Sequence, residues 1–200
     1  MRTITGLFDS RNQAETAVRS LRDAGVPDGD ISIITNNVDG SHDVDGDEAA
    51  KGVGTGAGVG AVVGGTGGLL AGLGMLAIPG VGPVVAGGWL LATAIGAVTG
   101  AAVGGATGGI MAALVEAGVD EGDAHVYAEG LRRGGTLVTA RVEDSRADAA
   151  QAILRNASGV EASKRRAEYE TEGWKGFDES ADPYSEDEIR NYHSSIRRGL

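Results

Sequence analysis

The feature that most constrains this chain is a block of 64 consecutive residues, Gly52 to Val115, without a single Asp, Glu, Lys, Arg or His. The block holds 21 of the 35 glycines in the 200-residue sequence, and most of its other residues are aliphatic. Disordered glycine linkers carry serine and other polar or charged residues instead. This composition therefore favours a packed or lipid environment over disorder.

Small residues recur through the block at four-residue intervals, in two series. We assign the glycines of both series to helix packing: Gly52, Gly56, Gly60, Gly64, Gly68 and Gly72 in the first, and Gly88, Gly96, Gly100, Gly104 and Gly108 in the second. A four-residue step keeps small residues near one face of a helix, and two such faces approach closely because glycine has no Cβ atom. The spacing predicts a glycine zipper between two helices.

A turn is expected at the centre of the block, where prolines and glycines interrupt both series. The turn residues are Pro79, Gly80, Gly82 and Pro83. They predict a helical hairpin with arms over Gly54–Ile78 and Val84–Leu114, because proline and glycine end helices and form tight turns. Each arm is long enough for a hydrocarbon core of ~30 Å, and a glycine-rich helix is better supported in lipid than in water. The sequence therefore predicts a transmembrane hairpin.

The distribution of basic residues predicts the orientation of such a hairpin. All 17 Lys and Arg residues lie outside the block, and the expected turn has none. The positive-inside rule then places both termini in the cytoplasm of an inner-membrane protein. The alternative is a cytoplasmic, soluble homo-oligomer such as a shell or filament, which would bury the hairpins in a common core.

The polar segments on either side of the block carry the patterns of an α/β domain. Before the block, strands are expected at Thr3–Phe8 and Ile31–Ile34, with a helix over Arg11–Ala24 between them. After it, a helix capped by Asp120 leads to a strand over Thr136–Val142. A helix capped by Ser145 follows, with Ala149, Ala152 and Ile153 facing inward, and a last strand begins at Val160–Ala162.

An internal repeat relates the two polar segments, because Asp9-Ser10-Arg11 matches Asp144-Ser145-Arg146, each after a strand. The sequence thus predicts an α+β, ferredoxin-like sheet with the hairpin inserted between its halves. The expected organisation is a first βαβ half (1–37), an acidic linker (38–51), the glycine-zipper hairpin (52–115), a second half (116–162) and a polar C-terminal tail with a short helix (163–200).

The tail contains three candidate docking residues, Trp174, Phe177 and Tyr184. Aromatic side chains exposed in a polar segment often anchor a protein partner. The alternative, equally weighted, is that these three side chains pack back on the chain's own domain.

Several chemical functions lack candidate residues. The sequence has no cysteine, its three histidines are scattered, and no serine lies in a nucleophile-elbow context, so we predict no catalytic or metal-binding site and no enzyme. Alternating acids at Asp43, Asp45 and Asp47 lack the glycine and glutamate of a calcium loop. No phosphate-binding loop is complete, so no cofactor is expected. A net charge of −11 argues against nucleic-acid binding.

Three stretches of the chain resemble a known family. Thr5-Gly6-Leu7-Phe8-Asp9 with the following Ala/Val/Leu helix is similar to the start of the bacterial general stress protein 17M-like domain, also called the heat-induced stress protein family. The segments 73–84 and 129–139 resemble related low-temperature-induced, glycine-zipper proteins. The resemblance implies a stress-associated, membrane-bound protein without an established biochemical activity, and it implies no catalytic residues.

These observations together predict a non-enzymatic stress protein whose hairpin inserts into the membrane and packs against other hairpins. The expected partners are the lipid bilayer, further copies of the chain and a protein that binds the tail. A soluble homo-oligomer remains the alternative.

Overall fold

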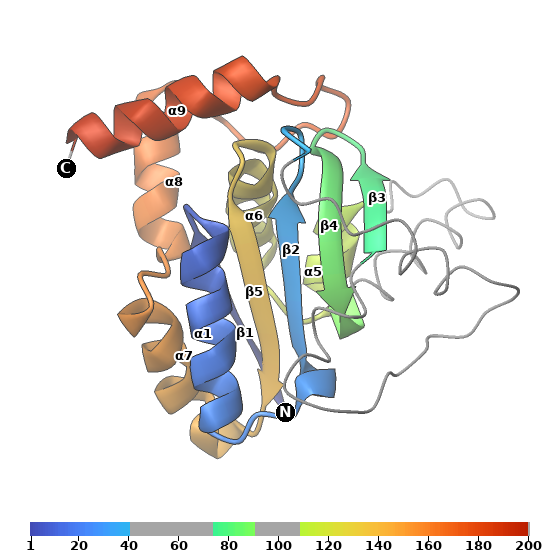
Figure 1. The fold of residues 1–200 in the computed structure, drawn as a ribbon, viewed down its shortest axis with the longest axis vertical. Coiled ribbons are helices and arrows are strands. Elements are labelled where there is room, and N and C mark those ends of the chain that lie inside the picture. Colours follow the sequence, from blue (N-terminus) through green and yellow to red (C-terminus); the bar gives the residue numbers. More distant parts are fainter. Residues whose placement is uncertain (41–73, 91–108, 200) are drawn as a thin grey trace, which may run out of the picture.

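The computed structural model describes residues 1–40, 74–90 and 109–199, and in this part of the chain an antiparallel sheet lies between two layers of helices (Figure 1). The strands are β1 (Arg2–Phe8), β2 (Ile31–Asn36), β3 (Gly74–Ile78), β4 (Gly82–Gly88) and β5 (Thr136–Val142). The helices are α1 (Arg11–Asp23), α5 (Ile110–Glu116), α6 (Glu121–Arg132), α7 (Ala147–Asn156), α8 (Ala162–Thr171) and α9 (Glu186–Gly199), with short 3₁₀ turns at Asp28–Asp30 and Asp144–Arg146.

The strand order in the sheet is β1-β5-β2-β4-β3. Both β1 and β2 pair antiparallel with β5, so they run parallel to each other on either side of it, and α1 connects them. This is a split βαβ unit, which is the supersecondary element that the sequence pattern predicted. The fold is therefore a mixed α/β sheet, as expected, with two additional strands beyond β2.

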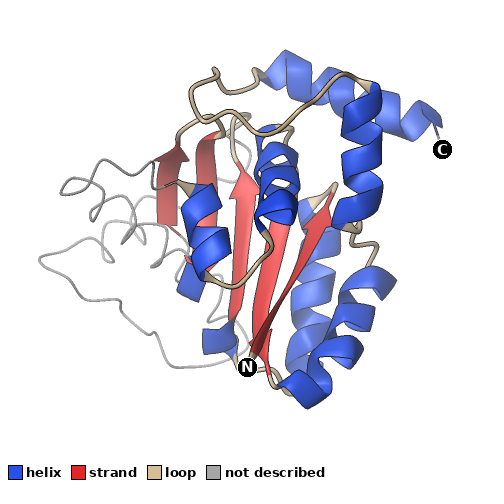
Figure 2. Ribbon diagram, turned by 180° about the vertical axis from the view of Figure 1, so that it is seen from behind, coloured by secondary structure: helices blue, strands red, loops and turns tan. Residues whose placement is uncertain are grey.

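Each face of the sheet has its own apolar core. On one face, α1 and α7 pack against Ile4, Phe8 and Val138, and on the other, α5 and α6 pack against Leu7 and Leu137. Figure 2 shows the second face, with α5 and α6 in front of the strands. On α6, the residues Ala124, Tyr127, Ala128 and Leu131 face the sheet and are all buried. Alternate residues of one strand thus stabilise two different helix layers.

The predicted helical hairpin is wrong at its centre. The segment expected to join two helices forms a β-hairpin instead, β3 and β4, and β4 pairs with β2 from Ser32↔Gly88 to Asn36↔Val84. The residues of β4 are glycine, proline, valine and alanine, and periodicity cannot distinguish such a short apolar run in a strand from a segment of a buried helix. Residues 54–73 and 91–108 of the two predicted arms lie outside the described residues.

The turn between β3 and β4 explains why the chain reverses at this point. The Val81 N–H donates to the Ile78 carbonyl at 3.1 Å. Pro79 takes the second turn position and Gly80 the third, where φ is +71°, as a type II turn requires. This local chemistry is compatible with two helices or two strands, so it predicts the reversal but not the elements that it connects.

Two further expectations for the second half of the domain need correction. The helix expected to be capped by Ser145 begins only at Ala147, after a 3₁₀ turn, and its buried residues are Ala147, Ala150 and Leu154. Of the residues expected to face inward, Ile153 is partly buried and packs against the core, Ala152 is partly buried, and Ala149 is exposed. The 3₁₀ turn advances the chain at about three residues per turn, which rotates the inward face. The last strand is reduced to one bridge between Val160 and Leu7, because α8 begins at Ala162.

The C-terminal tail contains two helices instead of the expected short one. In Figure 1, α8 stands beside the β1 edge of the sheet and α9 lies across one end of the domain. Ser185 and Glu188 form a capping box at the start of α9, with the Ser185 N–H donating to Glu188 Oε2 at 2.8 Å. Among the helices that the structure describes, none is sufficiently long and apolar to cross a membrane.

Candidate functional site

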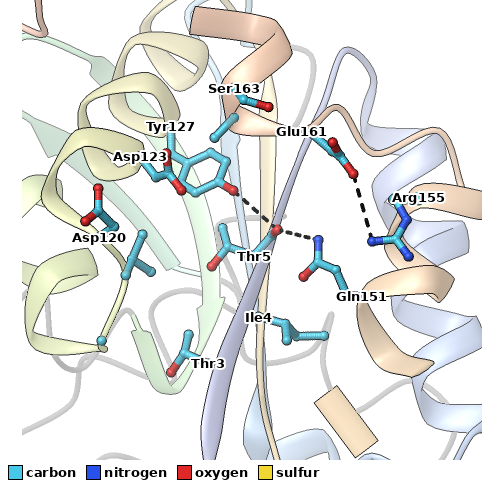
Figure 3. A pocket seen from close by; sticks show the side chains of 13 residues that line it. Thr3, Ile4, Thr5, Asp120, Asp123, Tyr127, Gln151, Arg155, Glu161 and Ser163 are labelled. Carbon is cyan, nitrogen blue, oxygen red and sulfur yellow. Dashed lines mark hydrogen bonds and ion pairs between the residues drawn. The ribbon is translucent and has the colours of Figure 1, made fainter. Parts of the chain in front are cut away.

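A groove runs along the outer edge of β1, on the side of the sheet opposite β3 (Figure 3). It is a cavity of about 350 Å³ between β1, α6, α7 and the beginning of α8. Its lining residues are Thr3, Ile4, Thr5, Gly118, Val119, Asp120, Asp123, Tyr127, Gln151, Arg155, Glu161, Ala162 and Ser163. Most of these side chains are polar or charged, so the groove is suited to a hydrogen-bonding ligand rather than an apolar one.

Thr5 lies at the centre of the groove, and its polar atoms have weak partners or none. Its carbonyl oxygen accepts from the Tyr127 hydroxyl at 3.5 Å and from Gln151 Nε2 at 3.4 Å, and both distances exceed those of good hydrogen bonds. Thr5 is 7% exposed, yet its Oγ1 atom makes no hydrogen bond. A buried polar atom without a partner costs free energy, about 1–3 kcal/mol, so this position has unused binding capacity.

The charges around the groove are mainly negative. Asp123 pairs with Arg166 at 2.9 Å, and Glu161 lies 3.9 Å from Arg155. The pKa of the Asp123 carboxyl is raised because partial burial disfavours its charge, and Asp120 adds to this shift while Arg166 opposes it. The local field therefore favours a ligand with positive charge.

Burial also raises the pKa of the Tyr127 hydroxyl, and the negative charges of Asp123 and Glu161 raise it further. Tyr127 therefore stays protonated at neutral pH and acts as a hydrogen-bond donor. Within residues 1–40, 74–90 and 109–199, no group of three His, Asp or Glu side chains is arranged to hold a metal ion. The groove offers carboxylates, hydroxyls and strand backbone, an arrangement for binding.

The three predicted docking residues of the tail contact the chain's own domain, which was the alternative interpretation. Phe177 is buried, and its backbone N–H donates to His125 Nδ1 at 3.1 Å. Trp174 packs against the apolar core that contains residues of α5 and α6, and its ring lies edge-on to Tyr169, with centroids 5.5 Å apart. The Arg132 guanidinium lies 4.7 Å from the centre of the Tyr184 ring. The tail is thus part of the folded domain.

Two buried arginines make contacts between the tail helices and the rest of the domain. Arg133 is 5% exposed and donates to Glu129 Oε1 at 2.7 Å, with the Tyr169 ring 4.2 Å from its guanidinium. Arg165 is 2% exposed and donates to Asp9 Oδ1 at 2.6 Å and to the Tyr192 hydroxyl at 3.0 Å. A tail in another position would leave these buried guanidinium groups without some of their partners, which costs free energy. The contacts therefore favour this one position of the tail.

The predicted helix-packing and turn residues that the structure describes lie in β4 or in the turn before it, and not in helices. Gly88 lies at the end of β4, opposite Ser32, with φ +96°, so its assignment to a helix face is wrong. Pro79 and Gly80 lie in the β3–β4 turn, and Gly82 and Pro83 begin β4. The other helix-packing glycines, Gly52, Gly56, Gly60, Gly64, Gly68, Gly72, Gly96, Gly100, Gly104 and Gly108, lie outside the described residues, as do Asp43, Asp45 and Asp47.

Sequence reasoning did not find the groove, although one signal for it was present. The expected last strand at Val160–Ala162 is followed by residues that favour a helix, Ser163 to Glu168. A strand shortened by a following helix leaves part of its neighbour's edge unpaired. Only the sheet order shows that this neighbour is β1.

The fold and the groove together define a class: an antiparallel α/β sheet with helices on both faces and an edge strand open to a polar groove. Residues 3–80 match the family described as the heat induced stress protein YflT domain. The resemblance predicted from Thr5–Asp9 and the following helix is thereby confirmed. No curated protein and no solved structure matches the chain significantly.

Proposed function

We propose that this stress-family protein is a non-enzymatic assembly protein in which the two glycine series pack against those of other copies. The observation that carries the proposal is the position of the β3–β4 hairpin in the sheet. It divides the charge-free block into two separate segments, and each begins and ends at the same folded domain.

The composition of these segments supports association. Residues 52–73 and 91–108 contain only glycine, aliphatic residues, alanine and a few threonines, and an apolar surface of this kind is stabilised by removal from water. Glycine at every fourth position gives a face that another backbone can approach closely. A second copy of the chain supplies the same face, so a symmetric homo-oligomer satisfies both partners at once.

The lengths of the two segments favour other copies over a bilayer as the partner. The first undescribed range is 33 residues long and the second is 18. A segment whose two ends belong to one domain must cross a membrane an even number of times, and two helical crossings need about 40 apolar residues. Neither segment reaches this length. In addition, Ile110, Ala113 and Leu114 of the predicted second arm are buried in α5 within the domain core.

Sedimentation velocity on the purified full-length chain tests this proposal. We expect the unchanged protein to sediment as an oligomer without detergent, and the double variant Gly64→Leu/Gly100→Leu to sediment as a smaller species. The matched control is Gly65→Leu/Gly105→Leu, which adds the same volume one residue outside the four-residue register and should retain the oligomer.

Three outcomes would overturn the proposal. One is an unchanged protein that stays monomeric over the micromolar range without detergent. A second is flotation of the protein with phospholipid vesicles accompanied by loss of the oligomer, which would make lipid the partner. Equal dissociation of the on-register and off-register variants would show that the glycine spacing is not the contact.

A further inference from the structure

The outer edge of β1 is paired at one position only within the described residues. The Val160 N–H donates to the Leu7 carbonyl at 2.8 Å, in an isolated antiparallel bridge. Since backbone groups alternate in direction along a strand, Thr5 and Thr3 direct their N–H and C=O groups to the same outer side as Leu7. Two residues of strand edge therefore face the groove.

The chain itself cannot continue the pairing that Val160 begins. An antiparallel strand would place the residues after Val160 opposite Thr5 and then Thr3. Instead, Glu161 is the N-cap of α8, and Ala162 is already helical. The ladder stops after one bridge, and the space that a longer strand would fill is the groove of about 350 Å³.

In place of a neighbouring strand, side chains from the two helix layers donate to the β1 edge, but their hydrogen bonds are long. In Figure 3, Tyr127 from α6 and Gln151 from α7 approach the Thr5 carbonyl from opposite sides. Their distances of 3.5 and 3.4 Å exceed the 2.7–3.2 Å of a ladder hydrogen bond. A peptide N–H could replace both with little loss.

A second and independent observation at the same position points to a ligand. Thr5 Oγ1 is buried and has no hydrogen-bond partner, and Thr5 lines the groove. An extended peptide carries alternating side chains, so a polar side chain of the peptide could reach this hydroxyl while its backbone pairs with the strand. The groove thus offers backbone recognition and one specific contact.

The charge at the groove indicates which peptides would fit. Asp120, Asp123 and Glu161 line it, against one lining cation, Arg155. Asp123 and Glu161 are partly balanced by Arg166 and Arg155, but the sum remains negative. Charge complementarity therefore favours a segment with a lysine or arginine beside its pairing residues.

We propose that the edge of β1 from Thr3 to Thr5 binds an extended, basic segment of a partner protein, which adds to the sheet as an antiparallel strand. The bound backbone donates to the Thr5 carbonyl and accepts from the Thr5 N–H, and its basic side chain lies beside Asp123. This inference does not depend on the assembly through the glycine series.

Fluorescence anisotropy with the full-length protein and a labelled, end-capped seven-residue peptide of alternating valine and threonine with a central lysine tests the proposal. Methylation of alternate peptide nitrogens should weaken binding about tenfold, since it removes the N–H group that donates to the Thr5 carbonyl. Methylation shifted by one residue should have little effect. Equal effects of both patterns, or no binding of the unmodified peptide at 1 mM, would overturn the proposal.

Substitutions in the protein separate strand addition from recognition of another polar ligand. Gln151→Ala and Tyr127→Phe remove the groups that the peptide must displace, so we expect unchanged or up to about threefold tighter binding. A large loss of affinity in either variant would show that these side chains, rather than the strand edge, recognise the ligand.

The charge preference has its own control. Asp123→Asn should weaken binding of the lysine peptide about two- to fivefold, as expected for a partly exposed ion pair, and should leave a peptide with glutamine at that position unaffected. Asp148→Asn, on the exposed side of α7, is the matched control and should change neither. Equal affinity of lysine and glutamate peptides would contradict the basic character of the partner.

Discussion

At the scale of single residues, Gly88 distinguishes most clearly between a strand and a helix. An ideal Cβ atom at this position would lie 2.2 Å from the Ile31 carbonyl oxygen and 2.5 Å from Ser32 Oγ. The same hydroxyl accepts from the Leu90 N–H at 2.8 Å. The absence of a side chain therefore serves a close approach between β2 and β4, and not the packing of two helices.

Replacement of Gly88 by alanine has opposite consequences for stability in a strand and on a helix face. We expect Gly88→Ala to lower the free energy of unfolding by about 2–5 kcal/mol, because it combines backbone strain at φ +96° with a clash against the neighbouring strand. On a helix face the same change would raise helix stability by about 1 kcal/mol. Urea unfolding followed by circular dichroism measures the difference.

Gly118→Ala is the control for the backbone contribution alone. Its φ is +90°, but a Cβ atom there meets nothing within 4 Å. We expect a loss of about 1–2 kcal/mol. A loss at Gly88 no larger than this one would argue against the close contact with β2.

At the scale of elements, the strands and helices of the polar segments could be predicted because their signals are local. The Ser10 side chain caps α1 by accepting from the Gln13 N–H, and Asp120 caps α6 by accepting from the Gly122 N–H. The pairing of β4 with β2 depends instead on residues 48 to 56 positions apart, from Asn36↔Val84 to Ser32↔Gly88, which are separated by an undescribed segment. No local pattern reports such a pairing, so the type of element could not be predicted there.

The inward face of α7 is a prediction that the element itself can test. Ala150 is buried, whereas Ala149, one position earlier and expected to face inward, is exposed. We expect Ala150→Glu to lower the free energy of unfolding by about 3–5 kcal/mol, because it buries an unpaired charge. Ala149→Glu should change it by no more than about 0.5 kcal/mol. Thermal unfolding of both variants measures these effects. If the helix began two residues earlier, Ala149→Glu would destabilise the protein more than Ala150→Glu.

The groove beside β1 also belongs to this scale, and its residues could not be recognised in advance. Thr5, Tyr127 and Gln151 come from three elements, and none has a motif or a spacing that relates it to the others. They meet because β1 is at the edge of the sheet and α8 begins directly after the bridge to Val160. Sequence patterns identify elements more readily than the surfaces between them.

At the scale of the whole molecule, the sheet brings the two ends of the first undescribed segment near each other. Asn36 and Leu76 both pair with Val84, so they lie on either side of β4, about 10 Å apart at the usual strand spacing. A chain of 33 residues is far longer than this gap requires.

A shortened chain tests whether the segment serves folding or association. We expect replacement of residues 42–72 by ten Gly/Ser residues, which span about 17 Å on average, to keep the amides of β2 and β4 protected from hydrogen exchange. The oligomer should become smaller in sedimentation. Loss of amide protection in this variant would show that the removed residues stabilise the sheet.

The insertion of β3 and β4 into the sheet also changes how the glycine-rich region can vary. Two arms of a hairpin must match each other in length and register, so an insertion in one requires a compensating insertion in the other. Here the first undescribed segment joins β2 to β3 and the second joins β4 to α5, so the two have separate attachment points on the folded domain. The length and sequence of one glycine-rich segment can therefore change without requiring a matching change in the other.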